Sequence, residues 1–182
     1  NVEGIEVEIL LIKDKFSEDG KYYFNRCLQK DIKYTVLDEN ADYNTLRGKF
    51  DSYDYVLDCI DSLSPKLALI ITCKRKKIKL VSAMGAGGKT DPSKVMVRDI
   101  SKTNNCFLAK QIRKKLKKEQ IHKGFRCVFS TEIQDENSLK MTDGSNYKKS
   151  FYGTISYMPA IFGLYAAAEV IRFLLKKEQN EA

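Results

Sequence analysis

The chain has 182 residues, 43% of them hydrophobic, and a formal net charge of +8, which fits a single soluble globular domain with a basic surface. Five cysteines without a Cys-x-x-Cys pair exclude a zinc site or redox dithiol of that type and favour a reducing, cytoplasmic location. The most apolar stretch, residues 155–175, is interrupted by Pro159, Glu169 and Arg172, so we expect no membrane-spanning segment, and no secretory signal is visible.

The first fifty residues carry one clear strand pattern. Apolar residues alternate with glutamates along residues 4–12, which predicts a strand there. Residues 13–50 are polar and rich in tyrosine, with short strand or helix candidates at 22–28 and 34–37. We interpret residues 13–50 as an insertion.

The segment that follows places two aspartates where a strand meets a helix. A short apolar strand runs into Asp58 and Asp61, and Ser64-Pro65 predicts the N-cap and first residue of a helix. Apolar residues then recur at helical spacing, and an apolar run at 78–81 predicts a second buried strand. Strand, helix and strand together predict a right-handed βαβ crossover.

This layout is typical of a nucleotide and metal pocket. In open parallel sheets ligands lie beyond the carboxyl ends of the strands, where Asp58, Asp61 and the glycine-rich turn at 85–88 should converge. A hard cation such as Mg²⁺, accompanying nucleotide phosphates, would suit Asp61. The alternative is that both aspartates cap the helix and bind water, because acidic caps are common at helix starts.

The second half of the chain continues the alternation of strands and helices. Residues 94–100 and 125–130 are predicted strands, separated by a lysine-rich helix that Asn104 or Asn105 could cap and that ends near Glu119. We expect a polar loop over residues 135–149.

The last predicted helix covers residues 158–177. One of its faces is apolar, and we expect that face to pack on the sheet or on a partner subunit. This face comprises Ile161, Leu164, Ala168, Ile171 and Leu175.

Basic residues gather in two clusters. The first contains Lys74, Arg75, Lys76, Lys77 and Lys79, and the second contains Lys110, Arg113, Lys114, Lys115, Lys117, Lys118, Lys123 and Arg126. On the lysine-rich helix we expect the lysines to point outward and the apolar residues Phe107, Leu108, Ile112 and Leu116 to face the core. RNA binding and a solvated helix face explain these charges equally well. For contact with nucleic acid we single out Lys110, Arg113, Lys114, Lys117 and Lys118.

Five motifs in this order resemble those of a known superfamily. They are DCIDS at 58–62, GAGGKTDP at 85–92, RDISKT at 98–103, CVFSTE at 127–132 and GTISYMPAIFGL at 153–164. The motifs resemble those of the ThiF/MoeB/HesA adenylating enzymes, which are related to ubiquitin-activating enzymes. Within that superfamily they are most similar to the TcdA-like (CsdL) branch, which dehydrates threonylcarbamoyladenosine in tRNA. The resemblance covers residues 53–132 and the chain from residue 152 into the last helix.

The resemblance implies a Rossmann-like α/β fold with a mostly parallel sheet, and a homodimer that binds ATP and Mg²⁺. It implies that ATP adenylates the carboxylate of the threonylcarbamoyl group on tRNA, after which an internal nitrogen closes a ring and expels AMP. One alternative is a relative that adenylates the C-terminus of a ubiquitin-like or sulfur-carrier protein, although the missing Cys-x-x-Cys pairs weigh against MoeB-like enzymes. The other alternative is a non-catalytic, basic RNA-binding module.

Motif positions also suggest roles for individual residues. Asp61 is the expected metal ligand and catalytic residue, Asp58 supports it, and Ser62 donates a hydrogen bond or caps the helix. Cys127 is a candidate nucleophile, although a cysteine in a strand is usually a core residue. Gly85, Gly87 and Gly88 would let the backbone approach the bound substrate or cation closely, or would simply form a tight turn. Lys89 would neutralise a phosphate or be a solvated lysine.

The phosphate-binding glycine loop of the family would lie upstream of Asn1. We therefore expect residues 1–182 to be the C-terminal part of a single ThiF-like domain whose N-terminal phosphate-loop portion is missing. On that expectation these residues alone lack half of the ATP site. ATP–pyrophosphate exchange by residues 1–182 alone should then show no turnover.

Overall fold

The computed structural model describes residues 9–12, 34–37, 53–134, 138–141 and 150–181. Its contacts divide the chain into two compact units, Asn1–Thr45 and Leu46–Ala182. The assignment of the whole chain to one domain, with an insertion, stays a prediction.

In the first unit, two short strands pair in parallel. Strand β1 (Ile9–Ile12) lies beside β2 (Tyr34–Leu37), with Ile9 opposite Tyr34. The strand β1 confirms the end of the first predicted strand, and β2 forms at one of the two candidate positions. The other candidate, residues 22–28, lies outside the described residues.

The second unit contains a four-stranded sheet in the order β3, β4, β6, β5. Its strands are β3 (Tyr55–Asp58), β4 (Lys79–Ala83), β6 (Arg126–Ser130) and β5 (Val95–Asp99). The first three run parallel to one another, and β5 runs antiparallel to β6. The predicted mostly parallel sheet is confirmed.

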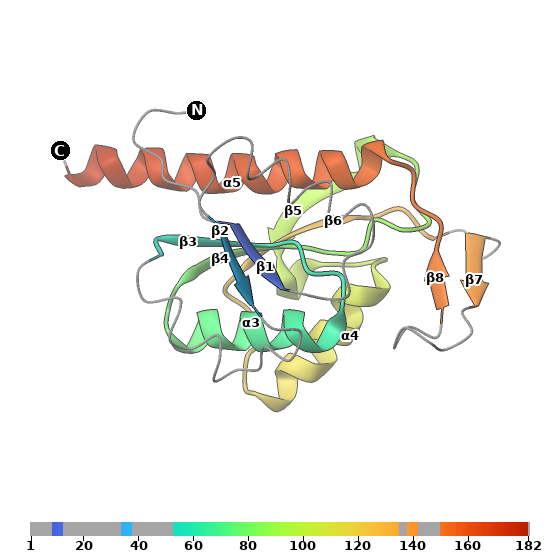
Figure 1. The fold of residues 1–182 in the computed structure, drawn as a ribbon, viewed down its shortest axis with the longest axis horizontal. Coiled ribbons are helices and arrows are strands. Elements are labelled where there is room, and N and C mark those ends of the chain that lie inside the picture. The colour runs from blue at the N-terminus through green and yellow to red at the C-terminus, as the bar shows by residue number, and fades with distance from the viewer. Residues whose placement is uncertain (1–8, 13–33, 38–52, 135–137, 142–149, 182) are drawn as a thin grey trace. The chain divides into compact units, whose positions relative to one another are not determined.

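Helices cover both faces of this sheet. Helices α3 (Leu63–Arg75) and α4 (Phe107–Lys118) lie on one face, and α5 (Tyr157–Glu181) lies on the other (Figure 1). Helix α3 connects the parallel strands β3 and β4, which confirms the predicted crossover. Two short 3-10 helices, η1 (Pro92–Lys94) and η2 (Ile100–Lys102), flank β5.

Helix α5 packs on the sheet through a face that the sequence did not single out. Met158, Phe162 and Ala166, spaced four residues apart, are buried in one cluster with the valines of β4, β5 and β6. Of the residues predicted to pack, Ile161 lies against this cluster, but Leu164 is 70% exposed. As a packing face on the sheet, the predicted face was therefore wrong, and its packing on a partner subunit stays a prediction. Apolar residues of α5 lie on all sides of the helix, so their spacing alone could not identify the side that is buried.

Residues Tyr157–Lys177 of α5 have a mean hydropathy of 1.6 and are long and apolar enough to cross a membrane, judged by length and composition. By this measure of length and composition, the prediction that no apolar stretch of the chain is long enough to span a bilayer was wrong. Pro159 lies in the first turn of the helix, where proline is tolerated. Of the charged side chains in this stretch, Glu169 and Arg172 pair with each other, because Arg172 Nη1 lies 3.6 Å from Glu169 Oε1.

Several boundaries differ from the predictions. Helix α3 begins at Leu63, so Ser62 rather than Ser64 occupies the N-cap position, and its side chain makes no capping hydrogen bond. Cys106 occupies the N-cap position of α4, while Asn105 donates from its side chain to the carbonyl of Thr131. Helix α4 ends at Lys118, as expected.

A small sheet occupies part of the segment that was predicted to be a loop. Strand β7 (Leu139–Met141) pairs with β8 (Ser150–Tyr152) in antiparallel fashion. The rest of the predicted loop, apart from Ser138, lies outside the described residues.

Candidate functional site

The parallel strands β3, β4 and β6 end at the same edge of the sheet. Asp58 ends β3 and lies opposite Ser82 of β4, which in turn lies opposite Cys127 of β6. The glycine-rich turn follows β4, and Glu132 follows β6. As predicted, the acidic segment and the glycine-rich turn follow neighbouring parallel strands at this edge.

Asp58 is the buried anchor of this edge. Asp58 is 1% exposed, and its Oδ2 accepts hydrogen bonds from Lys66 Nζ at 2.7 Å and from Ser82 Oγ at 2.5 Å. The other oxygen, Oδ1, accepts from the backbone N–H of Ile60 at 2.9 Å. Asp58 therefore neither caps α3 nor faces water, which rules out that alternative for this residue. It supports the loop that carries Asp61.

Lys66, the partner of Asp58, was missed by the sequence analysis. Both side chains of this ion pair are 0% exposed. Lys66 lies in the first turn of α3, where the positive end of the helix dipole disfavours a cation. A lysine at that position was a signal for a nearby carboxylate.

Asp61 differs from Asp58 because it is exposed. Its Oδ1 accepts a hydrogen bond from Ser62 Oγ at 3.3 Å, so the hydroxyl of Ser62 contacts Asp61 rather than capping the helix. In the described part of the chain no group of three or more His, Cys, Asp or Glu could hold a metal by itself. A single carboxylate nevertheless fits Mg²⁺ when phosphate oxygens and water complete its coordination.

Gly87 and Gly88 of the turn lie against another segment of the same chain. A Cβ on Gly87 would lie 3.0 Å from Tyr152 Cβ, and a Cβ on Gly88 would lie 2.9 Å from Tyr152 Cδ1. Gly88 has a φ of 68° and donates its N–H to the carbonyl of Gly153 at 2.8 Å. The close approach that these glycines permit is thus to Tyr152 and Gly153. At Gly85 an added Cβ would make only ordinary contact with Leu108, at 3.9 Å.

Lys89 is buried and holds the turn in place. Lys89 is 1% exposed, and its amine donates to the backbone carbonyls of Asn105, Ser130 and Glu132. Burial lowers the pKa of Lys89. The sequence predicted either a phosphate ligand or a solvated lysine. Both predictions were wrong, because carbonyl groups from two distant segments surround the amine.

Glu132 closes the same turn from the end of β6. Its carboxylate accepts hydrogen bonds from the N–H groups of Thr90 and Asp91, each at 2.9 Å, and from the hydroxyl of Thr90. Burial acts to raise the pKa of Glu132, but these hydrogen bonds outweigh it and leave the pKa below its ordinary value. We call this arrangement the Glu132 clasp.

Two further side chains reinforce the Glu132 clasp. Gln134 donates from Nε2 to the carbonyl of Gly87 at 2.9 Å, and Tyr157 donates from its hydroxyl to the carbonyl of Thr90 at 2.7 Å. The clasp therefore joins three motifs that are distant in the sequence, at 85–92, 127–132 and 153–164. None of its side chains was predicted, although the motifs themselves were quoted.

Cys127 lies in the core. It is 0% exposed on the central strand β6, and burial raises the pKa of its thiol well above the ordinary value. A thiol in this state is a poor nucleophile, so the candidate catalytic role of Cys127 is wrong. Cys59, Cys73, Cys106 and Cys127 are all free thiols.

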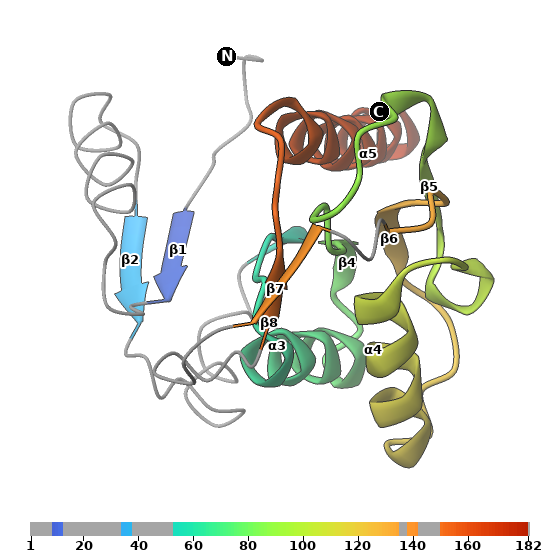
Figure 2. The same cartoon turned by 90° about the vertical axis from the view of Figure 1, so that its right-hand side faces the viewer.

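The two basic clusters meet in space. Helices α3 and α4 lie side by side (Figure 2), and their ends are joined by an ion pair between Arg75 and Glu119 at 2.7 Å. Lys74 Nζ also donates to the carbonyl of Gly124 at 3.0 Å. We call the exposed basic residues of α3, of α4 and of the turns that follow these helices the α3–α4 basic surface. Arg126 of the second cluster is not part of it, because it pairs with Glu169 of α5 at 3.1 Å.

Four of the five residues singled out for nucleic acid are exposed on this surface. They are Lys110, Lys114, Lys117 and Lys118. Arg113 is half-buried and donates to the carbonyl and the hydroxyl of Thr103. Phe107 is 62% exposed, so its predicted place in the core was wrong, and Ala109 is buried on that face instead.

Comparisons with known proteins agree with this geometry. The model of the ThiF family matches residues 25–182. A tRNA threonylcarbamoyladenosine dehydratase of Bacillus subtilis is 36% identical over 130 residues, which cover 68% of this chain and 51% of that protein. The corresponding protein of Haemophilus influenzae is 36% identical over 174 residues, which cover 89% of this chain and 64% of that protein. The chain thus spans about half to two thirds of the length of these relatives.

A solved structure gives the same result for the fold. The crystal structure of the E. coli tRNA N6-threonylcarbamoyladenosine dehydratase, TcdA, in complex with ATP superposes with a TM-score of 0.76 at 28% identity. The match covers 96% of this chain and 78% of that one.

Proposed function

Because the chain belongs to the ThiF family, we propose that the full-length protein uses ATP to adenylate a carboxylate, and that this carboxylate is the threonylcarbamoyl group of a tRNA adenosine. One observation carries the proposal. An exposed carboxylate, Asp61, stands on a loop anchored by the buried pair Asp58–Lys66, at the carboxyl edge of a sheet shared with an ATP-bound relative.

The proposed chemistry has two steps. A carboxylate oxygen of the substrate attacks the α-phosphorus of ATP, and pyrophosphate leaves, which gives an acyl-adenylate. A nitrogen of the same substituent then attacks the acyl carbon, loses its proton and expels AMP, which closes the ring. The net change in the nucleoside is the loss of water.

Each part of the edge has a role in this proposal. Asp61 would hold Mg²⁺, which when bound would neutralise charge on the phosphates. The Asp58–Lys66 pair and the Glu132 clasp fix the two loops between which the nucleotide would lie. The α3–α4 basic surface would attract the tRNA backbone without reading its sequence.

The exposed face of α5 supports the proposal that the protein is a homodimer. Leu164 is 70% exposed, and Tyr165 and Leu175 on the same helix are 43% and 44% exposed. Light scattering should give the mass of a dimer for the full-length protein and that of a monomer for Leu164→Glu. The exposed control Gln179→Glu should stay dimeric. A monomeric wild type would contradict the proposal.

The substrate is tested by mass spectrometry of tRNA nucleosides. Cells that lack the gene should lose the cyclic form of threonylcarbamoyladenosine and accumulate the open form. Wild-type full-length protein should restore the cyclic nucleoside, and Asp61→Ala should not. An unchanged nucleoside profile in cells that lack the gene would overturn the tRNA substrate. A stable complex with a diglycine-tailed protein would then favour the carrier-activating alternative.

A further inference from the structure

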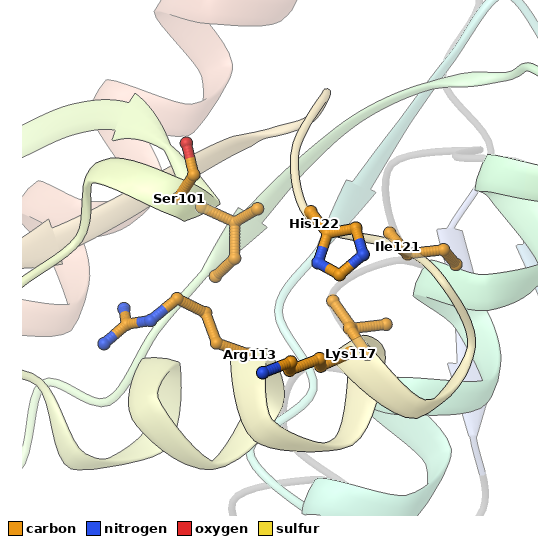
Figure 3. A pocket seen from close by; sticks show the side chains of 7 residues that line it. Ser101, Arg113, Lys117, Ile121 and His122 are labelled. Carbon is orange, nitrogen blue, oxygen red and sulfur yellow. The ribbon is translucent and has the colours of Figure 1, made fainter.

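A hollow of about 210 Å³ lies at the C-terminal end of α4 (Figure 3). It is at the opposite edge of the sheet from Asp61, because η2 follows the antiparallel strand β5 and Asp99 pairs with Arg126 at the start of β6. Figure 3 shows Arg113 and Lys117 projecting from α4, with Ile121 and His122 on the turn that follows. The residues that line the hollow are Ile100, Ser101, Arg113, Leu116, Lys117, Ile121 and His122.

The hollow combines an apolar floor with a polar rim. Ile100 and Leu116, each 1% exposed, form the floor together with Ile121. Lys117 and His122 on the rim are exposed. Ligand sites commonly combine apolar walls with a few polar groups, and drug-sized ligands occupy at least roughly 300 Å³. A hollow of about 210 Å³ suits a smaller unit with a flat apolar part.

The wall that carries His122 is fixed by the end of α4. Gln120 has a φ of 59°, and its N–H donates to the carbonyl of Lys117 at 3.3 Å. The N–H of Ile121 donates to the carbonyl of Leu116 at 3.0 Å. This is a Schellman motif with glutamine in the left-handed position that glycine usually takes. The motif places Ile121 and His122 over the last turn of the helix. The hollow is therefore formed before any ligand arrives.

The charge around the hollow favours an anion. The neighbouring carboxylates have cationic neighbours, since Asp99, which accepts from Ser101 and Gly124, interacts with Lys74, and Glu119 pairs with Arg75. Lys117 lines the hollow, and the helix that carries it, α4, contributes to the α3–α4 basic surface. A ligand that is anionic, partly flat and part of a larger polyanion matches these features.

We propose that this hollow binds one unpaired nucleotide of the tRNA. The base lies against Ile100, Leu116 and Ile121 and stacks on the ring of His122, while Lys117 contacts its phosphate. Unpaired RNA bases commonly stack on rings of this kind. The inference rests on the proposed tRNA substrate. Strand β6, with five residues, separates the hollow from the Asp61 edge by on the order of 15 Å, which an RNA stem-loop can bridge.

The first test fills the hollow without changing its charge. Ser93 and Ser101 occupy equivalent places in two 3-10 helices, and each donates from its hydroxyl and N–H to the preceding aspartate, Asp91 or Asp99. Only Ser101 lines the hollow. In the full-length protein Ser101→Trp should weaken tRNA binding by about tenfold or more, and Ser93→Trp by less than about twofold. Equal affinities for the two variants, with folding checked by thermal melting, would overturn the inference.

The second test separates stacking from charge. His122→Ala should weaken tRNA binding by about tenfold, and His122→Phe should restore it, because stacking needs only a ring. Lys117→Ala should weaken binding more than Lys114→Ala, which removes the same charge from the same helix outside the hollow. Failure of His122→Phe to restore binding, or equal effects of the two lysine variants, would overturn the inference. No tRNA binding by the wild type would overturn the tRNA substrate itself.

Discussion

Two loops at the same edge of the sheet have opposite environments. The loop at 58–61 has its buried partners behind it and leaves Asp61 exposed. The turn at 85–88 is covered by Tyr152 and Gly153 and is bound by Gln134. In sequence both loops follow a buried strand and both were predicted to face a ligand. The difference shows that a place at the carboxyl edge does not make a residue a ligand contact, because distant segments can occupy it first.

The largest effect on stability is expected at the anchor of the first loop. Lys66→Met leaves Asp58 as an uncompensated buried charge and should lower the free energy of unfolding by about 3–5 kcal/mol. Asp58→Leu combined with Lys66→Met removes both charges and should recover much of that loss. Chemical denaturation of the wild type, Lys66→Met, Asp58→Leu and the double variant measures the coupling. If the single and double variants were equally destabilised, the pair would not be the anchor.

A smaller effect is expected at the second loop. Gly88→Ala places a Cβ 2.9 Å from Tyr152 Cδ1 at a φ of 68°, and should lower the free energy of unfolding by about 1–3 kcal/mol. Gly163→Ala is the matched control. Nothing lies within 4 Å of its added Cβ, and it should stabilise α5 by about 0.5–1 kcal/mol. An unchanged free energy of unfolding in Gly88→Ala would mean that the turn is not held against Tyr152.

The smallest effect is expected at the Glu132 clasp. The lowered pKa of Glu132 means that its contribution to stability is complete above its ordinary pKa of 4.5 and is lost as the pH falls through the lower value in the folded protein. Glu132→Gln should cost about 1 kcal/mol at pH 7, because two backbone donors lose a charged acceptor at a partly exposed site. Wild type and variant should converge in stability below pH 4.5. A constant difference down to low pH would contradict the clasp.

Local patterns were sufficient for much of the fold and for the position of the site. The βαβ crossover, the end of α4 at Lys118 and the place of Asp58 at a strand end all follow from residues that are close in sequence. Patterns of that kind report which residues are apolar and where helices begin and end.

The environment of individual side chains required contacts over long distances. The residues next to Lys89 in sequence do not indicate whether its side chain is buried. Its amine donates to the carbonyl of Glu132, which is 43 residues away. Cys127 and Ser82 gain their environment from neighbouring strands, and the buried face of α5 depends on which side meets the sheet. Lys66 is the exception, because its place in the first turn of a helix already indicated an acidic partner.

The central claim is that Asp61 acts on the substrate while Asp58 acts on the fold. ATP–pyrophosphate exchange driven by substrate tRNA, measured with thermal melting on the full-length protein, tests it with Asp61→Ala and Asp58→Asn. Asp61→Ala should lose about 100-fold or more of the exchange rate with an unchanged melting temperature, and Asp58→Asn should melt several degrees lower. Exchange by Asp61→Ala within a few-fold of the wild type would contradict the account.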